Sequence, residues 1–220
     1  ALPVPKDTAR ALGALRRDIA THDAHMARVP AMNLIEIGGT CPAVPLTLPI
    51  RVGAWNLERC LFPQASAHHM RDCDLLLLSE MDHGMARTGQ CDTPREMADA
   101  LGMAHAYAVE FLELGLGSPV EQSFCTEDHN ARGFHGNAVM ARTALERPFA
   151  QRLPGRRQWF FDAEQPRLGE RIAIGAVVAT QAGPLLALST HLESACAPDH
   201  RCRQIESLLA LIDAEFPGIP

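Results

Sequence analysis

The sequence predicts a mixed α/β domain, because strand-like apolar runs alternate with segments of helical periodicity. The run DLLLLSE at 74–80 is apolar without alternation, which is typical of a strand covered on both faces. The segment 200–216 has helical spacing in its apolar residues Ile205, Leu208, Leu209, Ile212 and Phe216. The 220 residues, 47% of them hydrophobic, suffice for one domain with a buried core, and two small domains are the alternative.

Residues 1–49 are predicted to pack on that core without belonging to it. An amphipathic helix is expected over 6–28, starting at Asp7 or Thr8, with an apolar stripe made of Ala9, Leu12, Leu15, Ile19 and Met26. Residues 38–49 are rich in Gly and Pro and predict an irregular connection.

The core itself is expected to begin at residue 50. A strand at 50–55 should bury Val52, Ala54 and Trp55, and a helix near 64–72 leads to the strand at 74–80. Thr93 and Glu96 form a capping-box pattern for a helix that Gly102 ends. Further strands are expected at 105–114, 136–142, 156–161, 171–180 and 184–192, with a polar loop at 115–135 and a turn at 181–183.

Charge and composition narrow the class of function. The net charge is −6 and only 5% of residues are aromatic, which disfavours gripping long nucleic acid and favours a small or compact substrate. The chain contains neither a run of about 20 apolar residues nor an intact signal peptide, so a soluble protein is expected, cytoplasmic in preference to exported.

The seven cysteines show no zinc-type spacing. Cys60 and Cys73 flank apolar segments and are expected to be small buried residues. The remaining ones lie in loop-like sequence where pairing is possible, which leaves export open; they include Cys91, Cys125, Cys196 and Cys202.

Three strand ends carry polar side chains: Asn56, Glu80 and His191. Taken singly, these residues would be a turn former, a surface carboxylate and a buried histidine. Together they stand where α/β sheets place their active sites, beyond the ends of strands. Their joint occurrence predicts a catalytic site.

On these residues the sequence resembles the endonuclease/exonuclease/phosphatase superfamily of metal-dependent phosphoesterases. The matching stretches, in the order of the family, are AWNLE (54–58), DLLLLSEMD (74–82), GFHGNAVMAR (133–142), GERIAIGAVV (169–178) and LLALSTHLES (185–194). The resemblance covers 50–210. It implies a four-layer α/β sandwich of two packed mixed β-sheets flanked by helices.

The resemblance also implies roles for these residues. Glu80 would bind Mg²⁺ or Mn²⁺ directly with Asn56 as its neutral companion, and His191 would donate to the phosphoryl group or carry a proton. Arg171 would face the phosphate, hold another site residue in place without touching the substrate, or form an ion pair with a carboxylate. His135 and Asn137 would line the substrate pocket. Outside that set of residues, Glu58 is expected to pair with an arginine, and Tyr107 to pack in its strand.

The family's later Gly-Asp-x-Asn and Ser-Asp-His segments are not found in the sequence. The catalytic domain at 50–220 is therefore expected to be incomplete, and a C-terminal fragment of the same protein is expected to complete it; an inactive relative is the alternative. The predicted function is an Mg²⁺- or Mn²⁺-dependent phosphodiesterase or phosphatase. A metal-dependent nuclease, a noncatalytic scaffold of the same fold, and hydrolysis of a bond other than a phosphate ester remain alternatives.

Overall fold

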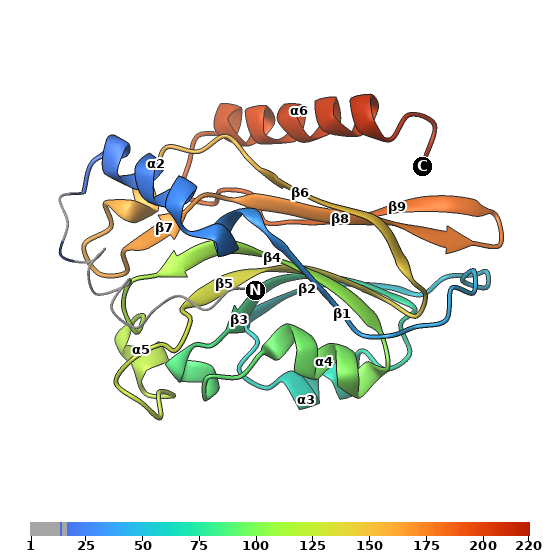
Figure 1. The fold of residues 1–220 in the computed structure, drawn as a ribbon, viewed down its shortest axis with the longest axis horizontal. Helices are drawn as coiled ribbons and strands as arrows, with labels where there is room; N and C mark the ends of the chain where they lie inside the picture. Colours follow the sequence, from blue (N-terminus) through green and yellow to red (C-terminus); the bar gives the residue numbers. More distant parts are fainter. Residues whose placement is uncertain (1–13, 15–16) are drawn as a thin grey trace.

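The computed structural model of the protein describes residue 14 and residues 17–220. Two β-sheets pack face to face, with helices α3 (Pro63–His69) and α4 (Thr93–Leu101) outside one sheet and α6 (Pro198–Glu215) outside the other, as Figure 1 shows. The four-layer α/β sandwich is confirmed.

The larger sheet has the strand order β1-β4-β5-β3-β2, and β7 (Arg167–Gly169) also pairs with β4. Its strands are β1 (Ile35–Gly38), β2 (Val52–Arg59), β3 (Leu75–His83), β4 (Ala104–Glu113) and β5 (Phe134–Ala141). Only β2 and β3 pair in parallel, so this sheet is mixed. In the smaller sheet, β6 (Leu145–Arg152), β8 (Ile172–Thr180) and β9 (Gly183–Thr190) pair antiparallel, and Leu46 adds an isolated parallel bridge to Thr180 at the end of β8.

Alternation along β4 explains why the strand is buried on both faces. Ala106 and Ala108 belong to the core between the two sheets, whereas Tyr107 and Val109 belong to the core beneath α3 and α4. The small alanines let the sheets approach each other. Tyr107 packs as expected, and its hydroxyl donates to the Met81 carbonyl over 3.2 Å.

A third apolar layer joins α6 to the smaller sheet through Leu208, Leu153 and Ala173. Phe216 is 4% exposed, as predicted, but Leu209 is 52% exposed and does not belong to the buried face. The helix also buries His200 and Gln204, which apolar periodicity does not reveal.

The N-terminal segment differs from its prediction. Helix α2 (Ile19–Arg28) begins at Asp18, whose carboxylate accepts from the Thr21 amide, and Ile19 is 55% exposed. The expected caps Asp7 and Thr8 lie outside the described residues. A 3-10 turn, η1 (Pro30–Asn33), then leads to β1, which pairs with β4 and is the edge strand of the larger sheet.

Two further local predictions are wrong. The helix α4 is capped by Asp92, whose side chain accepts from the Arg95 amide, while Thr93 is the first helical residue and donates to the Asp82 carbonyl. Residues 156–161 contain the 3-10 turn η3 (Gln158–Phe160) and no strand. The Gly102 stop is confirmed, with φ at 61°.

Strand β2 is much less buried than predicted, because it lies at the edge of the larger sheet. Val52 is 52% exposed and Trp55 is 39% exposed. The strand also continues through Asn56 to Arg59, although it was expected to span only 50–55.

Candidate active site

The backbone of the larger sheet is irregular where the predicted site lies. The β2–β3 register shifts between Asn56 and Arg59, and the β3–β5 register shifts between Leu78 and Met81. Glu80 sits within the second shift with φ at 57°, a left-handed conformation that is costly for a residue with a side chain. Such bulges redirect side chains and are frequent beside active sites.

These irregularities bring Asn56, Arg59 and Glu80 together. The Asn56 amide nitrogen donates to Glu80 Oε1 over 3.1 Å, and Arg59 donates to Glu80 Oε2. Asn56 Oδ1 accepts from the Glu58 amide over 3.0 Å, which fixes the orientation of the carboxamide. Both oxygens of Glu80 are thus oriented by neighbours from β2.

His191 reaches the same carboxylate from the end of β9 in the other sheet. Its Nε2 lies 3.7 Å from Glu80 Oε1, and its Nδ1 lies 2.9 Å from the Arg171 guanidinium. Arg171 can only donate, so Nδ1 must accept and the ring proton is on Nε2. The imidazole therefore presents an N–H group toward Glu80.

Arg171 is held by two buried carboxylates. It donates to Glu110 Oε1 over 2.6 Å and lies 3.3 Å from Glu193 Oε1. Its guanidinium also lies near the rings of Phe111 and Trp159, 5.4 Å from each centroid. These contacts hold Arg171 beside His191. The ion pairing predicted for Arg171 is therefore seen in the structure.

The protonation states follow from these neighbours. Burial would raise the pKa of Glu80, but His135, Arg59, the Asn56 hydrogen bond and His191 together lower it. Burial and Arg171 lower the pKa of His191, against the attraction of Glu80. At neutral pH the site therefore holds an ionised Glu80 and a neutral His191. Burial raises the pKa of Glu110 to about 7, although Arg171 opposes this shift.

Arg59 is the first member of a network of buried ion pairs. Arg59 pairs with Glu121 over 2.5 Å, and Arg87 lies 3.0 Å from the same oxygen of Glu121. Arg87 also forms a two-point contact with Asp82, at 2.7 and 3.0 Å. Asp82 in turn lies 2.8 Å from His135 Nδ1. The network thereby links the site to the interior of the sheet.

The carboxylate of Glu80 opens onto a cavity of about 380 Å³ lined by Asn56, Glu58, Arg59 and Glu80. Glu58 is exposed and makes no ion pair among the described residues, so its predicted pairing with an arginine is not seen. Its carboxylate adds negative charge to the cavity. Sequence reasoning missed this role.

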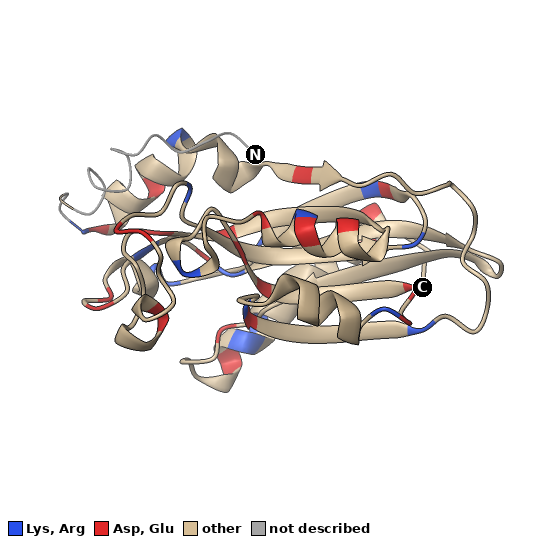
Figure 2. Cartoon of the chain, turned by 90° about the horizontal axis from the view of Figure 1, so that it is seen from below, with Lys and Arg blue, Asp and Glu red and all other residues tan. Residues whose placement is uncertain are grey.

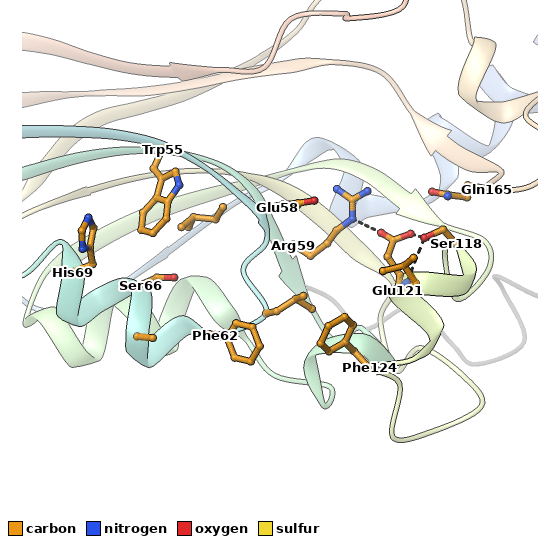
Figure 3. A pocket seen from close by; sticks show the side chains of 14 residues that line it. Trp55, Glu58, Arg59, Phe62, Ser66, His69, Ser118, Glu121, Phe124 and Gln165 are labelled. Carbon is orange, nitrogen blue, oxygen red and sulfur yellow. Dashed lines mark hydrogen bonds and ion pairs between the residues drawn. The ribbon is translucent and has the colours of Figure 1, made fainter.

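A wider groove of about 900 Å³ adjoins that cavity along β2 and α3. Figure 3 shows the Trp55, Phe62 and Phe124 rings along this groove, with the Arg59–Glu121 pair on the side away from Trp55. Phe62 is 64% exposed and Phe124 is 43% exposed. The groove therefore offers an apolar surface next to a charged one.

The structure places His135 and Asn137 away from the cavity. His135 is 1% exposed and is paired with Asp82, and burial holds its pKa well below the ordinary value. Asn137 is fully buried and donates to the Ile172 carbonyl over 3.0 Å, joining the two sheets. Direct contact of either residue with a substrate stays a prediction.

The chemistry of the cavity fits a hard divalent cation. Such an ion selects carboxylate and amide oxygens and keeps water at its other positions, and Glu80, Glu58 and Asn56 offer oxygens in a water-accessible cavity. Arg59 already balances the charge of Glu80, so a bound cation would share that carboxylate with the guanidinium or displace it.

Comparisons with known proteins agree with this fold. The chain is similar to a structure from Beutenbergia cavernae DSM 12333 described as an endonuclease/exonuclease/phosphatase, with 18% identity and a TM-score of 0.52 over 75% of this chain and 44% of that one. It is also similar to the human Nocturnin catalytic domain with bound sulfate, with 17% identity and a TM-score of 0.49 over 82% and 64% of the two chains. A 3′-5′ exonuclease from Neisseria meningitidis gives 11% identity and a TM-score of 0.44 over 76% and 53%.

The chain therefore shares its fold with the Beutenbergia endonuclease/exonuclease/phosphatase structure, as the sequence motifs predicted. It spans 44% of the length of the Beutenbergia chain. No family model and no curated protein matches the sequence.

Within residues 17–220, no helix combines the length and apolarity needed to cross a membrane. All seven cysteines are unpaired; Cys60 is buried and Cys73 is half-buried. Figure 2 shows acidic and basic residues interspersed on the side of the molecule that carries α3 and α4.

Proposed function

We propose that the protein is a divalent-metal-dependent phosphoester hydrolase, a phosphodiesterase or phosphatase that uses Mg²⁺ or Mn²⁺. The observation that carries the proposal is the meeting of Glu80 and Asn56 at one water-accessible cavity, with His191 Nε2 3.7 Å from Glu80 Oε1. The fold supports it, because the Beutenbergia structure that shares it is described as an endonuclease/exonuclease/phosphatase.

Each residue has a distinct part in this proposal. Glu80 and Asn56 hold the cation, which supplies positive charge at the phosphoryl oxygens when bound. The neutral His191 donates its Nε2–H group to a phosphoryl oxygen, a contact that strengthens as negative charge builds on that oxygen. Arg171 fixes the tautomer that makes this donation possible.

Arg59 lines the cavity and adds phosphate binding to the proposed site. Its guanidinium projects between Glu80 and Glu121, and it is 16% exposed at its side chain. The guanidinium would donate charge-assisted hydrogen bonds to a phosphate oxygen bound in the cavity.

A small phosphate ester is the proposed substrate class, in preference to long nucleic acid. The net charge of −6 opposes binding of a polyanion, and the side of the molecule in Figure 2 carries charges of both signs. A metal-dependent nuclease is the alternative.

We further propose that a companion segment adds to the outer edge of β9. This strand lies at the edge of the smaller sheet, and its Leu186 amide already donates to the Pro220 carbonyl over 2.7 Å; open edge strands are sites of strand addition. A C-terminal polypeptide of the same protein with Asp-x-Asn and Asp-His segments would suit this edge and would bring further acidic groups to the cavity.

The test is hydrolysis of bis(p-nitrophenyl) phosphate, p-nitrophenyl phosphate and plasmid DNA, each with Mg²⁺, Mn²⁺ or EDTA, by the chain alone and with that polypeptide co-expressed. Metal-dependent release of nitrophenol that Glu80→Gln abolishes supports the proposal. The matched control is Glu206→Gln, a change of the same type at an exposed position on α6. A folded, metal-binding complex without turnover would favour a noncatalytic scaffold instead.

A further inference from the structure

A second group of metal-type ligands lies outside the proposed active site. Glu36 on β1, His83 at the end of β3 and Asp92 at the start of α4 have ligand atoms that all lie within 4.8 Å of one another. His83 Nδ1 is 3.5 Å from Glu36 Oε2, and His83 Nε2 is 3.6 Å from Asp92 Oδ2. We propose that these three residues form a structural site for a transition-metal dication such as Zn²⁺.

The imidazole provides the observation that goes beyond a cluster of charges. The His83 side chain is 5% exposed, and its Nδ1 is buried without a hydrogen-bond partner. Leaving a buried polar atom unsatisfied costs free energy, so a ligand for this nitrogen is expected. Its ring packs against Tyr107 and Phe134, at centroid distances of 6.2 and 6.0 Å, which fixes its direction toward the carboxylates.

The backbone holds the three residues in place before any ion binds. His83 and Asp92 form an isolated antiparallel bridge, and the Gly84 amide donates to the Cys91 carbonyl over 2.8 Å. Asp92 uses Oδ1 to cap α4, which leaves Oδ2 directed at His83. Glu36 stands opposite Tyr107 in the β1–β4 pairing. A bound ion would therefore tie β1 to the core.

The ligand chemistry separates this site from the one at Glu80. One imidazole and two carboxylates suit Zn²⁺, whereas Mg²⁺ selects oxygen ligands almost exclusively. The cavity at Glu80 is lined by oxygen donors and a guanidinium. Zn²⁺ and Mg²⁺ thus serve as probes that discriminate between the two sites.

Arg95 occupies the solvent side of the cluster. Its guanidinium lies 3.2 Å from Glu36 Oε1 and 3.2 Å from Asp92 Oδ2, and its side chain is 58% exposed. A mobile surface cation of this kind balances the carboxylates and competes with a metal ion. Removing it by Arg95→Ala is expected to tighten Zn²⁺ binding.

The experiment measures bound Zn²⁺ per chain after dialysis, together with melting temperature in EDTA and in Zn²⁺. The wild type should hold one Zn²⁺ more than His83→Gln and Asp92→Asn, and Zn²⁺ at about 100 times its Kd should raise its melting temperature by about 5–10 °C. Asp92→Asn keeps a good helix cap, so its melting in EDTA should match the wild type.

Two controls make the result specific. His129→Gln removes an exposed histidine that also lies between two carboxylates, Glu127 and Asp128, and should leave Zn²⁺ binding unchanged. Glu80→Gln should likewise leave it unchanged, so failure of the proposed active site would not affect this test. Zn²⁺ binding that is absent from the wild type, or that survives in both ligand variants, would overturn the proposal and leave a cluster of polar side chains that binds no metal.

Discussion

The buried ion network makes a sharp prediction at Arg87. Its guanidinium is fully buried and contacts Asp82, Glu113 and Glu121, at distances between 2.7 and 3.3 Å. Arg87→Met keeps most of the apolar volume but leaves Asp82 without its arginine, whereas Glu113 keeps Arg167 at 3.4 Å. Removing one partner of a buried ion pair costs about 3–5 kcal/mol, and in a chain of this length each kcal/mol lowers the melting temperature by about 2–4 °C.

Part of that cost can be relieved by protonation. Burial already raises the pKa of Asp82 against the effect of Arg87, so the variant can take up a proton on this carboxylate. Urea denaturation at pH 7 should therefore show a loss near 3 kcal/mol, and a smaller loss at pH 5. The double variant Arg87→Met with Asp82→Leu should recover part of the stability, because it removes the unpaired charge. A loss below about 1 kcal/mol for Arg87→Met would refute the reasoning.

Three further predictions concern the site. His191→Ala in an active form of the protein should lower turnover by about two to four orders of magnitude with little change in melting temperature, as measured by nitrophenol release and calorimetry; a collapsed melting temperature with surviving specific activity would instead make His191 structural. The second change is Glu110→Gln. The pKa of Glu110 is about 7 in the folded protein and 4.5 ordinarily, so ionisation of this group lowers the stability of the wild type as the pH rises from 4.5 through 7. Urea denaturation at pH 5 and pH 8 should show that the variant lacks this loss, which is on the order of 2–3 kcal/mol in the wild type. Arg171→Met should raise the pKa of His191, measured by NMR titration of the ring protons, because it removes the cation at Nδ1; an unchanged or lower value would contradict the tautomer assigned here.

The interior strands could be predicted from sequence because their signal is local. The apolar run at 75–78 and the alternation in β4 specify buried strands whatever their neighbours are. Strand β6 was missed because it carries Pro148 and charged residues, which are typical of an edge strand and resemble a loop. Trp55 was misplaced because exposure depends on strand order, which no local pattern encodes.

The candidate site could likewise be predicted only in part. Asn56, Glu80 and His191 were predicted to meet because strand ends of one sheet sandwich converge, and the structure brings them together with Arg171. Arg59, Glu58 and Glu110 were missed or misassigned. Their roles depend on register shifts and left-handed backbone at 58–60 and 80, which place side chains that simple alternation would direct elsewhere.

The central claim, that Glu80 holds a divalent cation, is tested most directly by calorimetric titration with Mg²⁺. Mg²⁺ is the suitable probe because it avoids the imidazole of the second cluster. The account predicts saturable binding to the wild type and to Glu206→Gln, and binding weakened by more than about tenfold in Glu80→Gln, whose melting temperature should stay close to that of the wild type. Equal Mg²⁺ affinity of Glu80→Gln and wild type would contradict the account.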